Sequence, residues 1–214
     1  NKVMSLKTRF GNLGNILDFD NLTEENIYVL DSPVLTNSQF KKFKKFFSKK
    51  VKVIDCTFDI EKSLKERIEL IREEAETAVR QGSTCLVLSD KNISNKKASI
   101  PSILTVGAVH SHLVKHGLRG YCSLNVECSD AMDTHSFAIL IGVGATTVNP
   151  YLAIDSIYQR FEKKLFGKSD FETCVIKFKK SIDAGLLKIM SKIGISVISS
   201  YRGGCNFEAV GLSR

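Results

Sequence analysis

From residue 51 onward, short apolar stretches alternate along the chain with longer amphipathic ones. The apolar stretches predict buried strands at residues 51–55, 84–88, 120–127, 145–148 and 196–198. The amphipathic stretches repeat apolar residues every three or four positions and predict helices at residues 60–81, 103–116, 133–141, 151–166 and 171–192. Alternating strands and helices with short connections are typical of a mainly parallel sheet with flanking helices. We therefore predict an α/β fold of repeated βα units, for which an open sheet and a partial barrel are both possible.

The first 50 residues follow a different pattern. Residues 1–35 are loop-rich, and residues 41–50 hold six lysines and no acidic residue. Phe40, Phe43 and Phe47 fall on one face of a helix, with Ser32 or Asn37 as the expected cap. We interpret this segment as an amphipathic helix with a solvated lysine face, and binding of a polyanion is the alternative. Residues 1–214 are then expected to form a single domain, with 1–50 preceding the βα repeats of 51–214.

Charge and cysteine content narrow the class of protein. The formal net charge is +8, and without the six lysines of residues 41–50 it would be only +2. The charge is thus local, and no partner among nucleic acids is predicted. No apolar run reaches the roughly 20 residues that a membrane-spanning helix needs, and no signal peptide is visible. The six cysteines form no C-x-x-C pair, which favours reduced thiols in a cytoplasmic protein.

Two histidines form the first candidate constellation. His112 and His116 are four residues apart and would share one face of the predicted helix, as in some zinc sites. Asp133 or His135 would be needed as a further ligand. No acidic residue stands between the two histidines, and we favour a structural role for them, so that no metal site is predicted.

The second candidate lies in the turn after the last predicted strand. Ser200, Tyr201 and Arg202 occupy this turn, and Gly203-Gly204 would open a new helix whose free N–H groups could hold a phosphate. Ligands collect at this end of a strand in open and closed α/β sheets. Gly142 and Gly144 follow a predicted helix and are interpreted as caps. No nucleophile motif is present, so the residues alone leave open a free-standing α/β enzyme that binds a flavin or a phosphorylated ligand.

Several blocks of sequence resemble a known family. They are MSLKTRFGNLGN at 4–15, LDSPVL at 30–35, LVLSD at 86–90, IPSILTVGAVH at 100–110, IGVGATTVNPYL at 141–152, MSKIGISVISSYRG at 190–203 and FEAVGL at 207–212. Together and in this order they resemble the central domain of the large subunit of glutamate synthase. The resemblance extends over nearly the whole chain.

The resemblance implies a place in a larger oxidoreductase that makes two glutamates from glutamine and 2-oxoglutarate in ammonia assimilation. It implies an amidotransferase domain and a flavin domain as partners in the same chain, and it allows a small electron-donating subunit. FMN and an iron–sulfur cluster would belong to the domains outside this segment, which itself is expected to hold no catalytic, cofactor or metal residue. The chain begins with Asn1, so we expect a piece of a longer polypeptide, inactive alone. Ser200, Tyr201 and Arg202 are then candidates for interdomain contacts.

Overall fold

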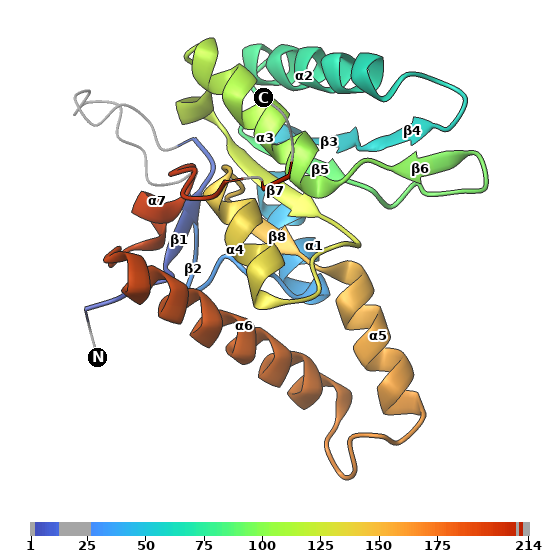
Figure 1. The fold of residues 1–214 in the computed structure, drawn as a ribbon, viewed down its shortest axis with the longest axis vertical. Helices are drawn as coiled ribbons and strands as arrows, with labels where there is room; N and C mark the ends of the chain where they lie inside the picture. The colour runs from blue at the N-terminus through green and yellow to red at the C-terminus, as the bar shows by residue number, and fades with distance from the viewer. Residues whose placement is uncertain (1–2, 13–26, 209, 212–214) are drawn as a thin grey trace.

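A four-stranded parallel sheet forms the centre of the computed structural model, which describes residues 3–12, 27–208 and 210–211 (Figure 1). The strands lie in the order in which they occur along the chain: β3 (Val51–Asp55), β5 (Cys85–Ser89), β7 (Ser123–Glu127) and β8 (Thr147–Asn149). Each of the four was expected from the apolar runs, with shifts of up to three residues at their ends. The predicted α/β class with a mainly parallel sheet is confirmed.

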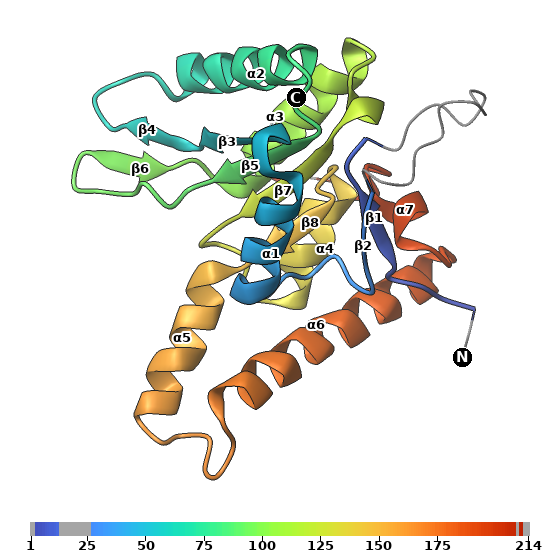
Figure 2. The same ribbon diagram turned by 180° about the vertical axis from the view of Figure 1, so that it is seen from behind.

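Consecutive strands are connected by helices that cover one face of the sheet. These helices are α2 (Leu64–Arg80), α3 (Ser102–Lys115) and α4 (Thr134–Gly142). On the opposite face lies α1 (Asn37–Phe47), which is in front of the sheet in Figure 2. A sequential strand order with its crossover helices on one side is the winding of a βα barrel, whereas a doubly wound sheet reverses its order at a switch point. The sheet therefore has the arrangement of a partial barrel.

Strand β5 shows why the central strands read as continuous apolar runs. Leu86 and Leu88 point into the core shared with α2, α3 and α4. Cys85 and Val87 point the other way and pack against the aromatic side chains of α1 and β1. Side chains alternate between the two faces of a strand, and both faces of this sheet are covered.

The lysine-rich helix forms as predicted. Phe40, Phe43 and Phe47 are buried on its inner face. Its cap differs from the prediction: Thr36 accepts a hydrogen bond from the Gln39 amide, and the Gln39 side chain accepts one from the Thr36 amide, so that the two make a capping box. Ser32 donates its hydroxyl hydrogen to Asp183, and Asn37 accepts from Asn149, so neither expected residue is the cap.

A two-stranded ribbon that was not predicted extends from the sheet. β4 (Thr57–Asp59) pairs antiparallel with β6 (Lys97–Ser99), which falls inside the polar segment 90–100. Helix α2 consequently begins at Leu64 rather than at residue 60. Ser63 marks this start, because its hydroxyl accepts a hydrogen bond from the Glu66 amide. Two short 3-10 turns, η3 (Ser48–Lys50) and η4 (Arg119–Tyr121), precede β3 and β7.

The expected fifth strand at residues 196–198 is wrong. Val197 makes only an isolated parallel bridge with Ser5, and the chain then enters the short helix α7 (Ile198–Tyr201). The chain start forms a separate antiparallel pair of β1 (Thr8–Phe10) and β2 (Tyr28–Leu30). A segment as short as 196–198, Ser-Val-Ile, does not by itself distinguish a strand from the start of a buried helix.

Two long helices, α5 (Tyr151–Glu162) and α6 (Phe171–Ile193), follow β8 and form a hairpin whose connecting end projects away from the sheet (Figure 1). They match the predicted helices at 151–166 and 171–192 except at the end of α5. Helix α6 passes close to α4, since a Cβ at Gly185 would lie only 2.4 Å from the Thr134 side chain. Among the described residues, no helix combines the length and the apolar character that a membrane crossing needs.

Candidate functional site

The carboxyl ends of the four strands are the first place to search, because ligands gather there in α/β folds. Ser89 ends β5, and its hydroxyl donates to the Glu127 carboxylate at the end of β7 at 2.6 Å. The ammonium group of Lys91 lies 2.9 Å from the other Glu127 oxygen. Glu127 is only 6% exposed. Its charge is thus matched by a hydroxyl and an ammonium group of the same edge.

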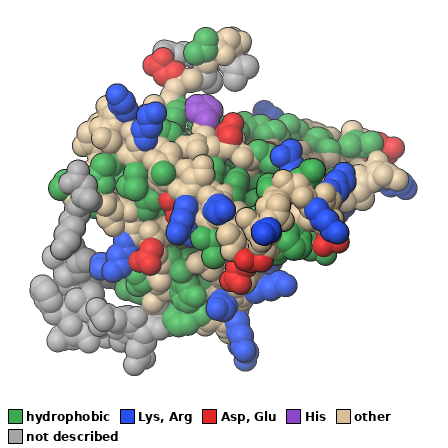
Figure 3. Space-filling model, turned by 90° about the horizontal axis from the view of Figure 1, so that it is seen from below, with side chains coloured by type: hydrophobic (Ala, Val, Ile, Leu, Met, Phe, Trp, Pro, Cys, Tyr) green, Lys and Arg blue, Asp and Glu red, His purple; other side chains and the backbone are tan. Residues whose placement is uncertain are grey.

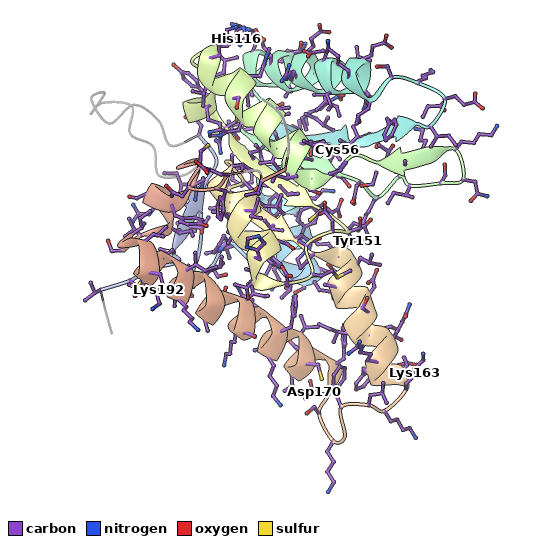
Figure 4. The ribbon with its side chains drawn as sticks, in the orientation of Figure 1. Cys56, His116, Tyr151, Lys163, Asp170 and Lys192 are labelled. Atoms are coloured by element: carbon purple, nitrogen blue, oxygen red, sulfur yellow. The ribbon has the colours of Figure 1, made fainter. Side chains whose placement is uncertain are left out.

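Asp90 follows β5 and is the second buried acid at this edge, with 2% of its surface exposed. One carboxylate oxygen accepts hydrogen bonds from the Ser129 amide at 2.9 Å, the Ser129 hydroxyl at 2.6 Å and the Ser99 hydroxyl at 3.3 Å. Burial, together with the neighbouring Asp90, raises the pKa of Tyr151, which begins α5 nearby (Figure 4). These contacts tie the loops after β5, β6 and β7 to the start of α5.

The thiols at this edge are unsuited to nucleophilic chemistry. Cys56 and Cys128 are 3% and 1% exposed. Burial raises the pKa of the Cys56 thiol to about 12 and raises that of Cys128 as well, so both stay protonated at neutral pH. A cavity of about 160 Å³ beside Asp130 and Ile103 near this edge is smaller than the several hundred Å³ of a typical small-molecule site, and a second cavity, of about 360 Å³ beside Asp55 at the end of β3, is lined mainly by charged side chains rather than by the apolar ones typical of such a site. The polar side chains of the carboxyl edge therefore connect loops to one another.

A half-buried arginine lies at the amino ends of β7 and β8. Arg119 donates to the carbonyls of Cys122 at 2.6 Å and Gly144 at 2.9 Å, and its Nε donates to His110 at 3.2 Å. Burial lowers the pKa of Arg119, and burial followed by the charge of Arg119 lowers the pKa of His110 to about 4. His110 is therefore neutral at pH 7. The guanidinium is satisfied by neutral acceptors, and no ion pair involves it among the described residues.

The candidate residues of the last turn lie at this same end of the sheet, opposite to the expected one. Ser200 is exposed, whereas Tyr201 is 1% exposed and donates its hydroxyl hydrogen to the Ala138 carbonyl at 3.1 Å. Tyr201 thus fastens α7 to α4. Arg202 is half-buried, and within the described part of the chain its Nε lacks a hydrogen-bond partner. Burial, and then the charge of Arg119, lower the pKa of Arg202 to about 10.

Arg202 opens onto a cationic pocket of about 330 Å³. We call this the amino-end pocket, and its lining residues are Ser5, Lys7, Arg9, Val197, Ser199 and Arg202. Three of these side chains are basic and two carry hydroxyl groups, so the pocket favours a negatively charged group. Sequence reasoning found Arg202 but missed Lys7 and Arg9, because the contact between the chain start and residues 197–202 is long-range. The expected helix after Gly203-Gly204 is absent from the described residues.

The two histidines meet a partner that was not expected. His112 and His116 share a face of α3 as predicted, but the acidic residue beside them is Glu76 of α2, with 2.6 Å between His112 Nε2 and Glu76 Oε2. Asp133 instead caps α4 by accepting from the Ser136 amide, and the ring of His135 faces Phe207. Glu76 is one of several acidic residues on α2, so only the packing of α2 on α3 identifies it.

The fold and these sites define a singly wound α/β domain whose buried polar groups hold loops together. Comparison with known proteins shows to which family the domain belongs. The family model of the glutamate synthase central domain matches residues 1–213. The chain is 52% identical over 216 residues to the glutamate synthase (NADPH) large chain of Azospirillum brasilense, a match that covers 100% of this chain and 14% of that one. The chain therefore belongs to the glutamate synthase central domain family.

Other relatives give the same result. The chain is 41% identical over 220 residues to the glutamate synthase (NADPH) large chain of Bacillus subtilis, covering 99% of this chain and 14% of the relative. It thus spans about one seventh of the length of the relatives that it matches. A solved structure of a mutant flavocytochrome b2 with benzoylformate is similar in fold alone, with a TM-score of 0.50, 15% identity and coverage of 83% of this chain and 41% of that one.

Proposed function

We propose that this domain is the central scaffold of a glutamate synthase large subunit. The complete subunit would convert glutamine and 2-oxoglutarate into two glutamates, with an amidotransferase domain releasing ammonia and a flavin domain, carrying FMN and an iron–sulfur cluster, reducing the adduct. The relatives named above are large chains of which this domain is about one seventh. In this proposal the domain fixes the distance and orientation of the two active sites, helps to enclose the ammonia path and has no activity alone.

The amino-end pocket is the observation that carries the scaffold role. Lys7, Arg9 and Arg202 bring three cations to one cavity, and among the described residues none of them forms an ion pair. Concentrated charge of one sign is usually neutralised by a partner group. We infer that an acidic side chain of a flanking domain occupies the pocket. Ser200, which is exposed, and Arg202 would contact the flanking domain directly. Tyr201, which is buried, would support this contact from inside the domain.

The α5–α6 hairpin offers a further surface for neighbouring domains. Tyr158, Leu165 and Ile176 expose 49%, 65% and 42% of their surface on it. On the face shown in Figure 3, Lys and Arg side chains are distributed among apolar ones. A groove of about 870 Å³ also lies between α5, α6 and the start of α1. Exposed apolar surface of this kind is typical of a contact region, and its occupant in this proposal is a flanking domain of the same subunit.

The arrangement at the carboxyl edge disfavours the alternative of a free-standing flavin or phosphate enzyme. Asp90 and Glu127, which would be available to a ligand in an open site, are buried; Glu127 is bonded to Ser89 and Lys91, and one oxygen of Asp90 is bonded to Ser129. A titration of the 214-residue chain with FMN tests this. The scaffold role predicts no change in melting temperature and no quenching of flavin fluorescence, whereas the enzyme alternative predicts both.

Substitution of Arg202 in the complete subunit tests the scaffold role itself. Arg202→Ala removes a half-buried cation of the amino-end pocket, so glutamine hydrolysis should become less tightly coupled to glutamate formation from 2-oxoglutarate. The measurement is the ratio of glutamine consumed to 2-oxoglutarate consumed, expected to rise above one. Lys65→Ala, which removes an exposed cation of α2 outside both proposed contact surfaces, is the control and should leave the ratio unchanged. An unchanged ratio in Arg202→Ala would remove this residue from the interdomain contact.

A further inference from the structure

Three potential metal ligands meet on the outer surface of the α2–α3 pair. His112 and His116 come from the last turns of α3, and Glu76 comes from α2 (Figure 4 labels His116 at this end of α3, beside α2). The ligand atoms of the three side chains all lie within 4.8 Å of one another. His112 Nε2 is 2.6 Å and His116 Nε2 is 4.0 Å from the same oxygen, Glu76 Oε2.

Packing of the two helices holds this arrangement in place. Ala75, Ala78 and Val79 of α2 and Val109 and Leu113 of α3 are buried in one core. Positions 76, 112 and 116 flank that core on the solvent side, with side-chain exposures of 22%, 20% and 35%. The core therefore holds the backbone of the three residues in place, whereas their side chains remain partly exposed to water. An ion can reach them without any opening of the core.

Hydrogen bonds around the three side chains orient them toward a common point. His116 Nδ1 lies 2.8 Å from the His112 carbonyl, which assigns the ring proton to Nδ1 and leaves the Nε2 lone pair free toward Glu76. Metal-binding histidines are typically oriented by such a bond from the other ring nitrogen. Arg80 binds Glu76 Oε1 at 2.8 Å, so Oε2 is the oxygen directed at the histidines. The hydrogen bond from Arg80, followed by that from His112, lowers the pKa of Glu76, which keeps it a carboxylate.

We propose that His112, His116 and Glu76 bind one divalent transition-metal ion such as Zn²⁺, with water completing its coordination. Two imidazoles and one carboxylate favour zinc, copper, nickel or cobalt over magnesium and calcium. Ligand atoms at about 2.0 Å from a tetrahedral ion are roughly 3.3 Å apart. The His112–Glu76 separation must therefore widen from its hydrogen-bonded 2.6 Å and the His116–Glu76 separation must shrink from 4.0 Å, both by less than 1 Å.

The proton between His112 and Glu76 is what the ion must displace. Binding of Zn²⁺ at this site releases that proton, because His112 Nε2 needs its lone pair for the metal. The ion would join α2 to α3, so zinc should raise the melting temperature. A rise of about 5–10 °C is expected at a free zinc concentration one hundredfold above the dissociation constant.

Titration of the metal-free 214-residue chain with Zn²⁺ by calorimetry tests the proposal. We expect one ion per chain, and a loss of at least tenfold in affinity in His112→Ala, His116→Ala and Glu76→Gln. His135→Ala removes an exposed histidine elsewhere and should bind zinc normally. Circular dichroism of each variant verifies the fold, and if His112→Ala failed to fold, His116→Ala at the more exposed position would decide.

The exposed thiol of Cys205 is the competing ligand. Cobalt distinguishes the two, because a Co²⁺ complex with nitrogen and oxygen ligands lacks the thiolate charge-transfer band in the near ultraviolet. The proposal expects no such band and unchanged binding in Cys205→Ser. Zinc binding that survives the histidine substitutions but disappears in Cys205→Ser would overturn the site, as would an absence of zinc binding altogether.

Discussion

The aromatic face of α1 offers a sharp test of whether the lysine-rich segment is structural. Phe43 is 0% exposed, and its ring lies 4.9 Å from Phe40, 5.4 Å from Phe10 and 6.5 Å from Phe47 between ring centres. Phe43→Ala leaves a cavity among these rings, because they are fixed by the helix and by β1. Such a substitution typically costs about 3–5 kcal/mol of unfolding free energy.

Phe46 provides a matched control three residues along the same helix. It is 49% exposed, and its ring packs against those of Tyr28 and Phe47. Phe46→Ala makes the same chemical change, with the same gain in helix propensity, at a half-solvated position. We expect a cost of about 1 kcal/mol, because roughly half of the side chain's apolar surface is already in water and no enclosed cavity forms.

Urea unfolding and thermal melting of the two variants measure this difference. For a chain of this length, about 2–4 °C are lost per kcal/mol, so Phe43→Ala should melt roughly 6–20 °C below the parent chain and Phe46→Ala a few degrees below it. Neutralising the exposed lysines Lys41 and Lys45 to Gln should change stability by less than about 0.5 kcal/mol. Equal losses in Phe43→Ala and Phe46→Ala would contradict the burial argued for α1.

Two further predictions concern the amino end of the sheet. Tyr201→Phe removes the hydroxyl that donates to the Ala138 carbonyl and should cost about 1 kcal/mol in urea unfolding while leaving glutamine coupling in the complete subunit unchanged; a coupling defect without destabilisation would show instead that the hydroxyl acts at the interface. His110, with its folded pKa of about 4, takes up a proton more readily when unfolded, so stability should fall as the pH drops from about 6.5 to 4, by about 1–2 kcal/mol after allowance for solvent screening. Unfolding titrations of the parent chain and of His110→Asn measure this, and an equal pH slope in both would exclude His110 as the cause.

Local sequence predicted the parts of the fold that local physics determines. Residues 84–88 read as a strand because both faces of β5 are buried, and the Phe40, Phe43 and Phe47 spacing gave α1 because one face of that helix is buried. The ribbon of β4 and β6 was missed, since its strands are polar and pair across about 40 residues of chain. The strand predicted at residues 196–198 is wrong because Ile198 is buried as the first residue of helix α7 and not as part of a strand.

The candidate sites depended on contacts that no local pattern reveals. His112 and His116 were recognised as one face of a helix, yet their partner Glu76 is identified only by the packing of α2 against α3. We predicted the wrong end of the sheet for Arg202, because that prediction depended on a strand at residues 196–198 that does not form. The resemblance to the glutamate synthase central domain identified the family correctly, because it depends on several long motifs and not on the prediction of single contacts.

The two ends of the sheet differ in how their charges are balanced, and this difference bears on how such a domain works. At the carboxyl end, the buried Glu127 is matched by the Ser89 hydroxyl and Lys91, and one carboxylate oxygen of Asp90 accepts hydrogen bonds from Ser129 of the domain itself. At the amino end, Arg119 donates to neutral acceptors, Arg202 lies near the charge of Arg119, and neither forms an ion pair among the described residues. Buried cations without a counter-charge weaken a domain in isolation. Their cost is offset when a neighbouring carboxylate approaches, so the same residues that destabilise the separate domain would strengthen its attachment within the complete subunit.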